Sequence, residues 1–322
     1  MPIFASGLTA ILLLITSFFA FTAESPRTVA LTQIVEHPSL DAARHGILDE
    51  LAAAGYTPGQ NLKIDYQNAQ GNPITAAQIA RKFVGDRPDV IVTITTPSAQ
   101  AVVAATRELP VVFCSVSDPL GAKLVNNLAK PGGNVTGTSD LSPIAEQLDL
   151  IRELSPDAKK LGVLYNPGEA NSVSLVALLK TQASGKGLQV IEATAPKSGD
   201  VLSAARQLAG KAEAIYIPLD NTVVSALEAV IKVGRDARIP VYSADTDSVG
   251  RGTVASLGFD YYDVGRQTGQ QVVRILRGEK PGDIPVERVK KLNLYVNLQA
   301  AEAMGTTIPD SVRQRAINLS KP

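Results

Sequence analysis

The sequence repeats one pattern of residues in its two halves. Residues 89–103 read DVIVTITTPSAQAVV and residues 213–227 read EAIYIPLDNTVVSAL, so each has an apolar run, a short polar segment and then helix-forming residues. A second apolar run follows in each half, LPVVF at 109–113 and IPVYS at 239–243, and after it Asp118 or Asp245. This repeat is too long for a solenoid and predicts two similar α/β lobes, with a cleft for a small molecule between their polar strand ends.

Apolar runs and helix-forming segments alternate along both halves. In the first half we expect strands at 28–35, 61–67, 90–93 and 110–115, separated by helices at 39–54, 75–84 and 98–107. In the second half we expect strands at 161–165, 188–193, 214–218 and 240–243, separated by helices at 172–184, 201–209 and 222–233. This alternation requires parallel sheets with helical crossovers.

Two segments rich in Gly and Pro, residues 130–138 and 277–282, are expected to be a chain reversal and crossings between the lobes. The predicted fold is therefore two Rossmann-like lobes, each a parallel sheet flanked by helices, joined by a hinge. Lobe 1 is expected to hold residues 27–137 and about 257–285, and lobe 2 residues 138–256 and about 286–322.

The N-terminal residues 1–23 contain no charged side chain, and most of residues 8–23 are apolar. Such a segment predicts a secretory signal peptide, cleaved after Ala23, and hence a periplasmic protein; an uncleaved membrane anchor is the alternative. The segment has no Lys or Arg before its apolar part, and no cysteine lies near its end to carry a lipid.

The composition argues against several classes of function. Lys+Arg and Asp+Glu both number 31 and form no basic run, so nucleic-acid binding is not expected. Cys114 is the only cysteine and there are two histidines, which predicts neither a disulfide nor a metal site. The sequence also lacks a nucleophile elbow, a dinucleotide-binding fingerprint and a phosphate-binding loop, so we expect no cofactor and no catalysis.

The candidate ligand-binding residues follow the predicted strands. In the first half they include His37, Thr96, Ser98 and Asp118, and in the second half Asn171, Ser172, Asp220, Asn221 and Asp245. The N-terminal ends of the helices there favour an anion, and Asp118, Asp220 and Asp245 can pair with an ammonium group, so an amino acid suits the pattern. The same residue types are also ordinary helix N-caps that need no ligand.

Six segments together resemble a known family. They are TPSAQAVVAAT at 96–106, VSDPLGAKLV at 116–125, KPGGNVTGTSD at 130–140, YNPGEANSV at 165–173, IPLDNTV at 217–223 and GFDYYDVGRQTG at 258–269. With them the chain resembles the periplasmic substrate-binding components of ABC transporters, in the tryptophan/tyrosine-binding-protein-like group, over about residues 27–317. That group has the type I periplasmic-binding-protein fold.

The resemblance implies a two-lobed receptor that captures a small solute, an aromatic or branched amino acid, and delivers it to a membrane permease driven by a separate ATPase. We expect this receptor to be a monomer. By position it also implies which residues face the cleft: Thr96, Ser98, Asp118, Ser139, Asn171, Ser172, Asp220, Asn221, Asp245 and Tyr261. A ligand-sensing module that signals to a chemoreceptor or sensor kinase is the alternative function, because the same two lobes serve both.

Overall fold

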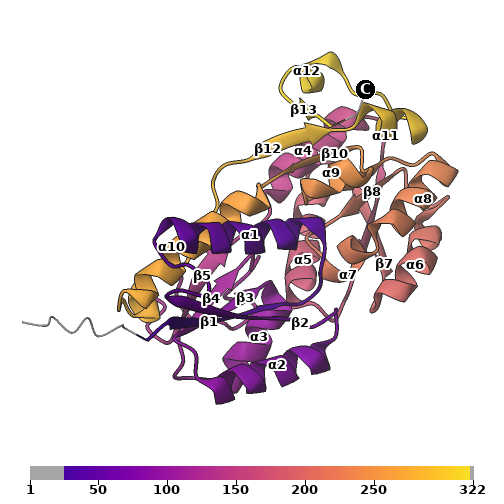
Figure 1. Ribbon diagram of the computed structural model, residues 1–322. Helices are drawn as coiled ribbons and strands as arrows, with labels where there is room; N and C mark the ends of the chain where they lie inside the picture. Colours follow the sequence, from indigo (N-terminus) through magenta and orange to yellow (C-terminus); the bar gives the residue numbers. More distant parts are fainter. Residues whose placement is uncertain (1–24, 320–322) are drawn as a thin grey trace, which may run out of the picture.

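The computed structural model describes residues 25–319, and the expected signal segment 1–23 lies outside this range. Within residues 25–319, no helix is long and apolar enough to span a bilayer. The chain forms two α/β lobes, each with its own sheet and its own apolar core (Figure 1). The expected fold class is confirmed.

The first lobe is built on one parallel sheet. Its strands are β1 (Arg27–Gln33), β2 (Leu62–Asn68), β3 (Val90–Ile94), β4 (Val111–Cys114), β5 (Val135–Ser139) and β11 (Glu287–Arg288). They are arranged in the order β11-β5-β4-β3-β1-β2, and every pair is parallel. Strands β3 and β4 are buried along their whole length, as expected for a sheet covered on both faces.

Four helices cover this sheet. Helices α2 (Pro73–Asp86) and α3 (Thr96–Ala105) pack together on one face, and α1 (Pro38–Ala53) and α10 (Tyr261–Leu276) pack together on the other (Figure 1). Glycines allow α1 and α10 to come very close: a Cβ at Gly265 would lie 2.0 Å from the Ala43 carbonyl oxygen. Helix α10, although late in the sequence, therefore belongs to the core of the first lobe.

The second lobe repeats this plan and adds C-terminal strands. Its strands are β6 (Lys160–Tyr165), β7 (Gln189–Thr194), β8 (Ala214–Ile217), β9 (Val241–Ser243), β10 (Ala255–Gly258), β12 (Asn293–Val296) and β13 (Ile317–Asn318). The order is β13-β12-β10-β9-β8-β6-β7, with β12 antiparallel to β10. Its helices are α4 (Ile144–Leu154), α5 (Ala170–Ser184), α6 (Val201–Leu208), α7 (Asn221–Ser225), α8 (Leu227–Ala237), α9 (Asp247–Arg251), α11 (Leu298–Ala303) and α12 (Asp310–Arg313).

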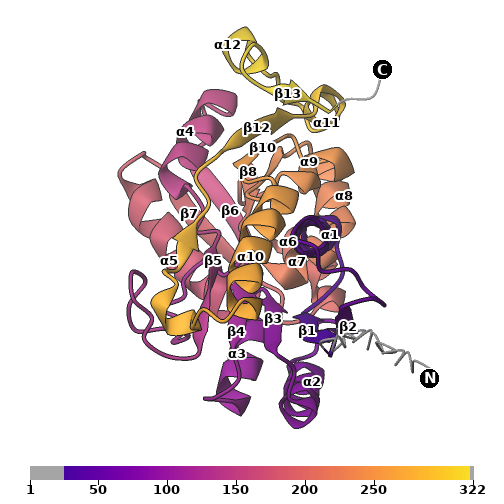
Figure 2. The ribbon, with the colours of Figure 1, turned by 60° about the vertical axis from the view of Figure 1, so that its left-hand side comes forward.

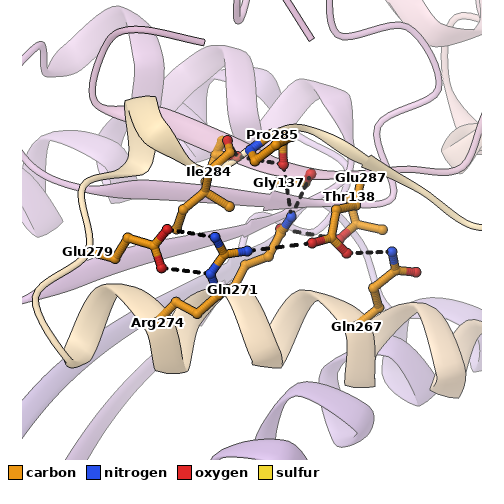
Figure 3. A network of polar contacts seen from close by, with 10 residues as sticks. Gly137, Thr138, Gln267, Gln271, Arg274, Glu279, Ile284, Pro285 and Glu287 are labelled. Carbon is orange, nitrogen blue, oxygen red and sulfur yellow. Dashed lines mark hydrogen bonds and ion pairs between the residues drawn. The ribbon is translucent and has the colours of Figure 1, made fainter. Parts of the chain in front are cut away.

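The chain passes between the sheets three times, after β5, after β10 and after β11 (Figure 2). These strands place the crossings after Ser139, Gly258 and Arg288, a few residues beyond the expected positions at 137, 256 and 285. Polar side chains of α10 hold the segment that leads into the third crossing against the first lobe (Figure 3). Gln271 Nε2 donates to the carbonyl oxygens of Gly137 and Pro285, both at 3.3 Å, and Arg274 pairs with Glu287 at 3.7 Å.

Two local expectations were wrong, and two helices were missed. The chain reversal expected at 130–138 is limited to its first residues, because β5 begins at Val135 and pairs with β4. The single helix expected at 222–233 is two helices, α7 and α8, since Ala226 leaves helical geometry with φ −122°. Helices α4 and α9 were not expected.

Candidate functional site

A cavity lies between the two lobes at the carboxyl ends of their strands. The empty space there is about 340 Å³ when the open solvent at its mouth is included. The residues that line it are His37, Ser39, Leu40, Thr95, Ser115, Ser117, Asp140, Asn171, Leu219, Asp220, Asn221, Val224, Asp245 and Tyr261. Three are aspartates and, of these lining residues, none is Lys or Arg, so the cavity is acidic.

The first-lobe wall of the cavity contains hydroxyl groups without partners. Thr95 follows β3 and lines the cavity, whereas Thr96 and Ser98, in the first turn of α3, do not line it. All three hydroxyl groups are buried and have no hydrogen-bond partner among the described residues. Because buried polar groups are nearly always paired, this end of the cavity can accept a polar ligand group.

Backbone strain occurs in the same wall. Thr95, with φ 74°, and Ser115, with φ 57°, are in the left-handed region that residues other than glycine rarely adopt. Each directly follows a strand, β3 or β4, and each lines the cavity. Such strain costs about 1–3 kcal/mol and is concentrated at ligand sites, where it positions side chains for binding.

Asp140 lies on the first crossing and accepts two hydrogen bonds inside the cavity. Ser117 Oγ donates to its Oδ1 at 3.1 Å, and the hydroxyl of Tyr261 donates to its Oδ2 at 3.0 Å. Burial raises the pKa of Asp140 to about 6. A carboxylate has about four acceptor positions, so Asp140 keeps capacity for a cationic ligand group.

Asp220, in the second lobe, is the N-cap of α7 and has three donors from the protein. The backbone N–H of Asn166 and the Ser172 hydroxyl both donate to its Oδ2 at 2.6 Å, and the Val223 N–H donates to Oδ1 at 2.7 Å. Burial, and then the charge of Glu169, raise the pKa of Asp220 to about 7. Asp220 therefore has fewer acceptor positions left for a ligand than Asp140 has.

Glu169 completes this network behind Asp220. Its Oε1 accepts from the Thr222 hydroxyl at 2.8 Å and the Thr222 N–H at 3.1 Å, and its Oε2 accepts from both nitrogens of Asn221. Asn171 donates through Nδ2 to the Leu219 carbonyl oxygen at 2.8 Å. Its Oδ1 is buried and has no hydrogen-bond partner among the described residues.

Hydrogen bonds from Ser39 and Ser174 join the lobes directly. The Ser39 hydroxyl of α1 donates to Asp245 Oδ1 at 2.7 Å inside the cavity. The Ser174 hydroxyl of α5 donates to Asp118 Oδ2 at 3.0 Å outside it. The lobes are therefore closed on each other in this structure.

The structure brings six of the eleven expected site residues to the cavity wall: His37, Asn171, Asp220, Asn221, Asp245 and Tyr261. The other five do not line it. Thr96 and Ser98 follow Thr95 in the first turn of α3, and their hydroxyls are buried. The hydroxyls of Ser139 and Ser172 donate to neighbouring oxygens, and the carboxylate of Asp118 accepts from the Ser174 hydroxyl. Sequence reasoning did not select Asp140, whose neighbour Ser139 it chose instead.

Comparison with known proteins identifies the family. The sequence profile of the ABC transporter substrate-binding proteins matches residues 28–319. The chain belongs to the ABC transporter substrate-binding protein family, and its fold is that of type I periplasmic binding proteins. Proteins of this family are typically found outside the cytoplasmic membrane.

Three relatives carry more specific information. A tyrosine-binding protein of Clostridioides difficile (strain R20291) is 41% identical over 278 residues, which are 86% of this chain and 81% of the relative. An ABC domain from Streptococcus pneumoniae, solved in complex with L-Trp, is 38% identical with a TM-score of 0.88, and the match covers 91% of this chain and 99% of that one. The ligand-free, open structure of CD0873, a substrate-binding protein with adhesive properties from Clostridium difficile, is also 38% identical, with a TM-score of 0.69 and coverage of 92% and 100%.

Proposed function

We propose that this protein captures an amino acid with an aromatic side chain in the cavity between its lobes and delivers it to an ABC permease driven by a separate ATPase. Relatives that bind tyrosine and tryptophan support the choice of ligand. The observation that carries the proposal is the acidic, closed cavity, which has unpartnered hydroxyl groups in one wall and carboxylates beside it.

The ligand ammonium is assigned to Asp140. This carboxylate is buried, accepts hydrogen bonds from the Ser117 and Tyr261 hydroxyls and has no cationic neighbour among the lining residues. A ligand ammonium supplies the missing positive charge and strengthens the hydrogen bond it donates. Asp245 and Asp220 add negative potential but are engaged by three protein donors each.

The ligand carboxylate is assigned to the start of α3. Free N–H groups and the helix dipole make this end positive, and the Thr95 hydroxyl stands unpartnered beside it. A zwitterionic ligand can therefore place its carboxylate at α3 and its ammonium at Asp140.

The rest of the cavity suits an apolar side chain. Leu40 comes from the first lobe, and Leu219 and Val224 come from the second. Side chains from both lobes would then contact the ligand, so binding favours the closed arrangement. The higher TM-score to the L-Trp complex than to the open structure, at equal sequence identity, agrees with a closed arrangement of this chain.

We further propose that the protein acts as a monomer in the periplasm and that residues 1–23 are the export signal. The apolar, uncharged character of that segment is the basis of this assignment.

A thermal-shift screen tests the proposed function. The purified protein is unfolded and refolded to remove bound ligand and then mixed with each of the twenty amino acids, with sugars and with purines. We expect a rise in melting temperature for tryptophan and tyrosine, because a ligand that binds only the native state stabilises it. A response limited to sugars or purines would refute the amino-acid assignment.

A further inference from the structure

His37 is the one imidazole in the wall of the cavity, and its position is unusual. It is the N-cap residue of α1, but its side chain makes no capping hydrogen bond. The residue is only 9% exposed, and its Nδ1 is buried without a hydrogen-bond partner among the described residues. The helix therefore does not need this side chain, and a buried imidazole nitrogen without a partner is costly.

The imidazole is neutral in this environment. Burial, with a smaller contribution from Arg251, lowers the pKa of His37 to about 4 against the opposing effect of Asp245 and Asp41. A neutral imidazole carries one N–H donor and one acceptor nitrogen. It can therefore donate to a phenol oxygen or accept from a phenol O–H or an indole N–H.

The location of His37 matches the side-chain end of the proposed ligand. Thr95 and Asp140, which are assigned to the ligand carboxylate and ammonium, come from the turn before α3 and from the first crossing, whereas His37 and Leu40 come from the start of α1. His37 shares its stretch of wall with Leu40, which is apolar. An aromatic side chain packed on Leu40 would bring its polar group toward the imidazole.

We propose that His37 selects among aromatic amino acids by hydrogen-bonding to the polar group of the ligand side chain, so that tryptophan and tyrosine are bound more tightly than phenylalanine. This inference rests on the proposed function, because it requires an amino acid in the cavity. With phenylalanine the imidazole nitrogen stays buried and unpartnered, and a site built to pair a ligand hydroxyl or N–H discriminates strongly against a ligand that lacks it.

Titration calorimetry on the ligand-stripped protein tests the proposal with matched ligand pairs. Tyrosine is compared with phenylalanine, and tryptophan with 1-methyltryptophan, which lacks the indole N–H. We expect the polar member of each pair to bind roughly 10- to 100-fold more tightly. In His37→Phe both ratios should fall to within about threefold, and His37→Gln, which keeps a donor and an acceptor, should restore part of them.

The control is Thr95→Val, which should weaken all the ligands by one common factor and leave both ratios unchanged. If the wild-type protein binds these amino acids without preference in either pair, the role of His37 is refuted and the proposed function stands. The same conclusion follows if folded His37→Phe keeps the wild-type ratios. If none of the ligands binds the wild-type protein, the proposed function itself fails and the inference fails with it.

Discussion

The two walls of the cavity are built from similar βα units but differ in how their polar groups are satisfied. In the first lobe, the hydroxyls of Thr95, Thr96 and Ser98 have no protein partner within the described part of the chain. In the second lobe, the carboxylates of Asp220 and Glu169 accept hydrogen bonds from the surrounding backbone and side chains. The first wall thus offers a ligand the Thr95 hydroxyl, whereas the carboxylates of the second wall, though not the Asn171 Oδ1, are satisfied by the protein itself.

This difference predicts which substitutions weaken ligand binding and which ones destabilise the fold. Removing a group whose partner is the ligand should weaken binding and leave the unliganded fold intact. Removing a group whose partners are all in the protein should destabilise the fold, because the abandoned donors stay buried. Substitutions in the two walls should therefore give opposite results in binding and unfolding experiments.

Asp220→Ala should give the largest effect, and it should be on stability. The substitution leaves the Asn166 and Val223 N–H groups and the Ser172 hydroxyl without their acceptor, so we expect the free energy of unfolding to fall by about 3 kcal/mol. Urea unfolding measures this change. Asp200→Ala is the control, because Asp200 precedes α6 without making a side-chain cap. Equal stability of the two variants would contradict the assigned role of Asp220.

Asp140→Asn should give the largest loss of binding. Removing the charge that faces the ligand ammonium should lower the affinity for tryptophan about 100-fold. Titration calorimetry on the ligand-free protein measures this affinity, and Asp157→Asn, at an exposed position, is the control. A variant that binds as the wild type does would remove Asp140 from the ammonium site.

The same carboxyl group should make wild-type binding depend on pH. Because burial holds the pKa of Asp140 at about 6, protonation below pH 6 removes the partner of the ammonium, and affinity should fall by up to about tenfold per pH unit. The stability of the unliganded protein should change in the opposite direction. The folded pKa is above the ordinary value near 4, so the folded state binds more protons between about pH 4 and pH 6, and this contribution is lost as pH rises through that window. Both dependences should be weaker in Asp140→Asn.

Thr95→Val should lower the affinity about tenfold without lowering stability. Valine keeps the shape of threonine and removes only a hydroxyl that has no protein partner in the described chain, so the free energy of unfolding should stay within about 1 kcal/mol. Thr194→Val, at an exposed position on β7, serves as control. A large loss of stability in Thr95→Val would show that the first wall is structural.

Ser174→Ala should give the smallest effect. Its hydroxyl contacts Asp118 across the lobes but does not line the cavity, so the substitution removes one bond specific to the closed state. We expect the affinities for tryptophan and tyrosine to fall by the same factor, about threefold. A change in the ratio of the two affinities would mean that Ser174 acts on the ligand directly.

The repeated βα pattern was sufficient to predict the architecture, because strands such as β3 and β8 are continuous apolar runs in a covered sheet. Strand β5 could not be found this way, since Val135–Ser139 is short and polar and becomes a strand through its pairing with β4. Helix α4 did carry a signal, the spacing of Ile144, Leu148 and Ile151 on one face, which the sequence analysis did not use.

The cavity wall was harder to predict for a different reason. Residues at strand ends can be located from sequence, and six of them line the cavity. Asp140 and Asp220 differ in how many of their acceptor positions the protein already occupies. This difference depends on contacts between distant segments, such as the hydrogen bond from Tyr261 to Asp140 across 121 residues. No local pattern records such a contact.

Calorimetry with three ligands tests the central claim, that the cavity recognises both charged groups of an amino acid. The stripped protein is titrated with L-tryptophan, with tryptamine, which lacks the carboxylate, and with indole-3-propionate, which lacks the ammonium. The account predicts that tryptophan binds and that each analogue binds at least about 100-fold more weakly, because each leaves one end of the site unpaired. Binding of either analogue with the affinity of tryptophan would contradict it.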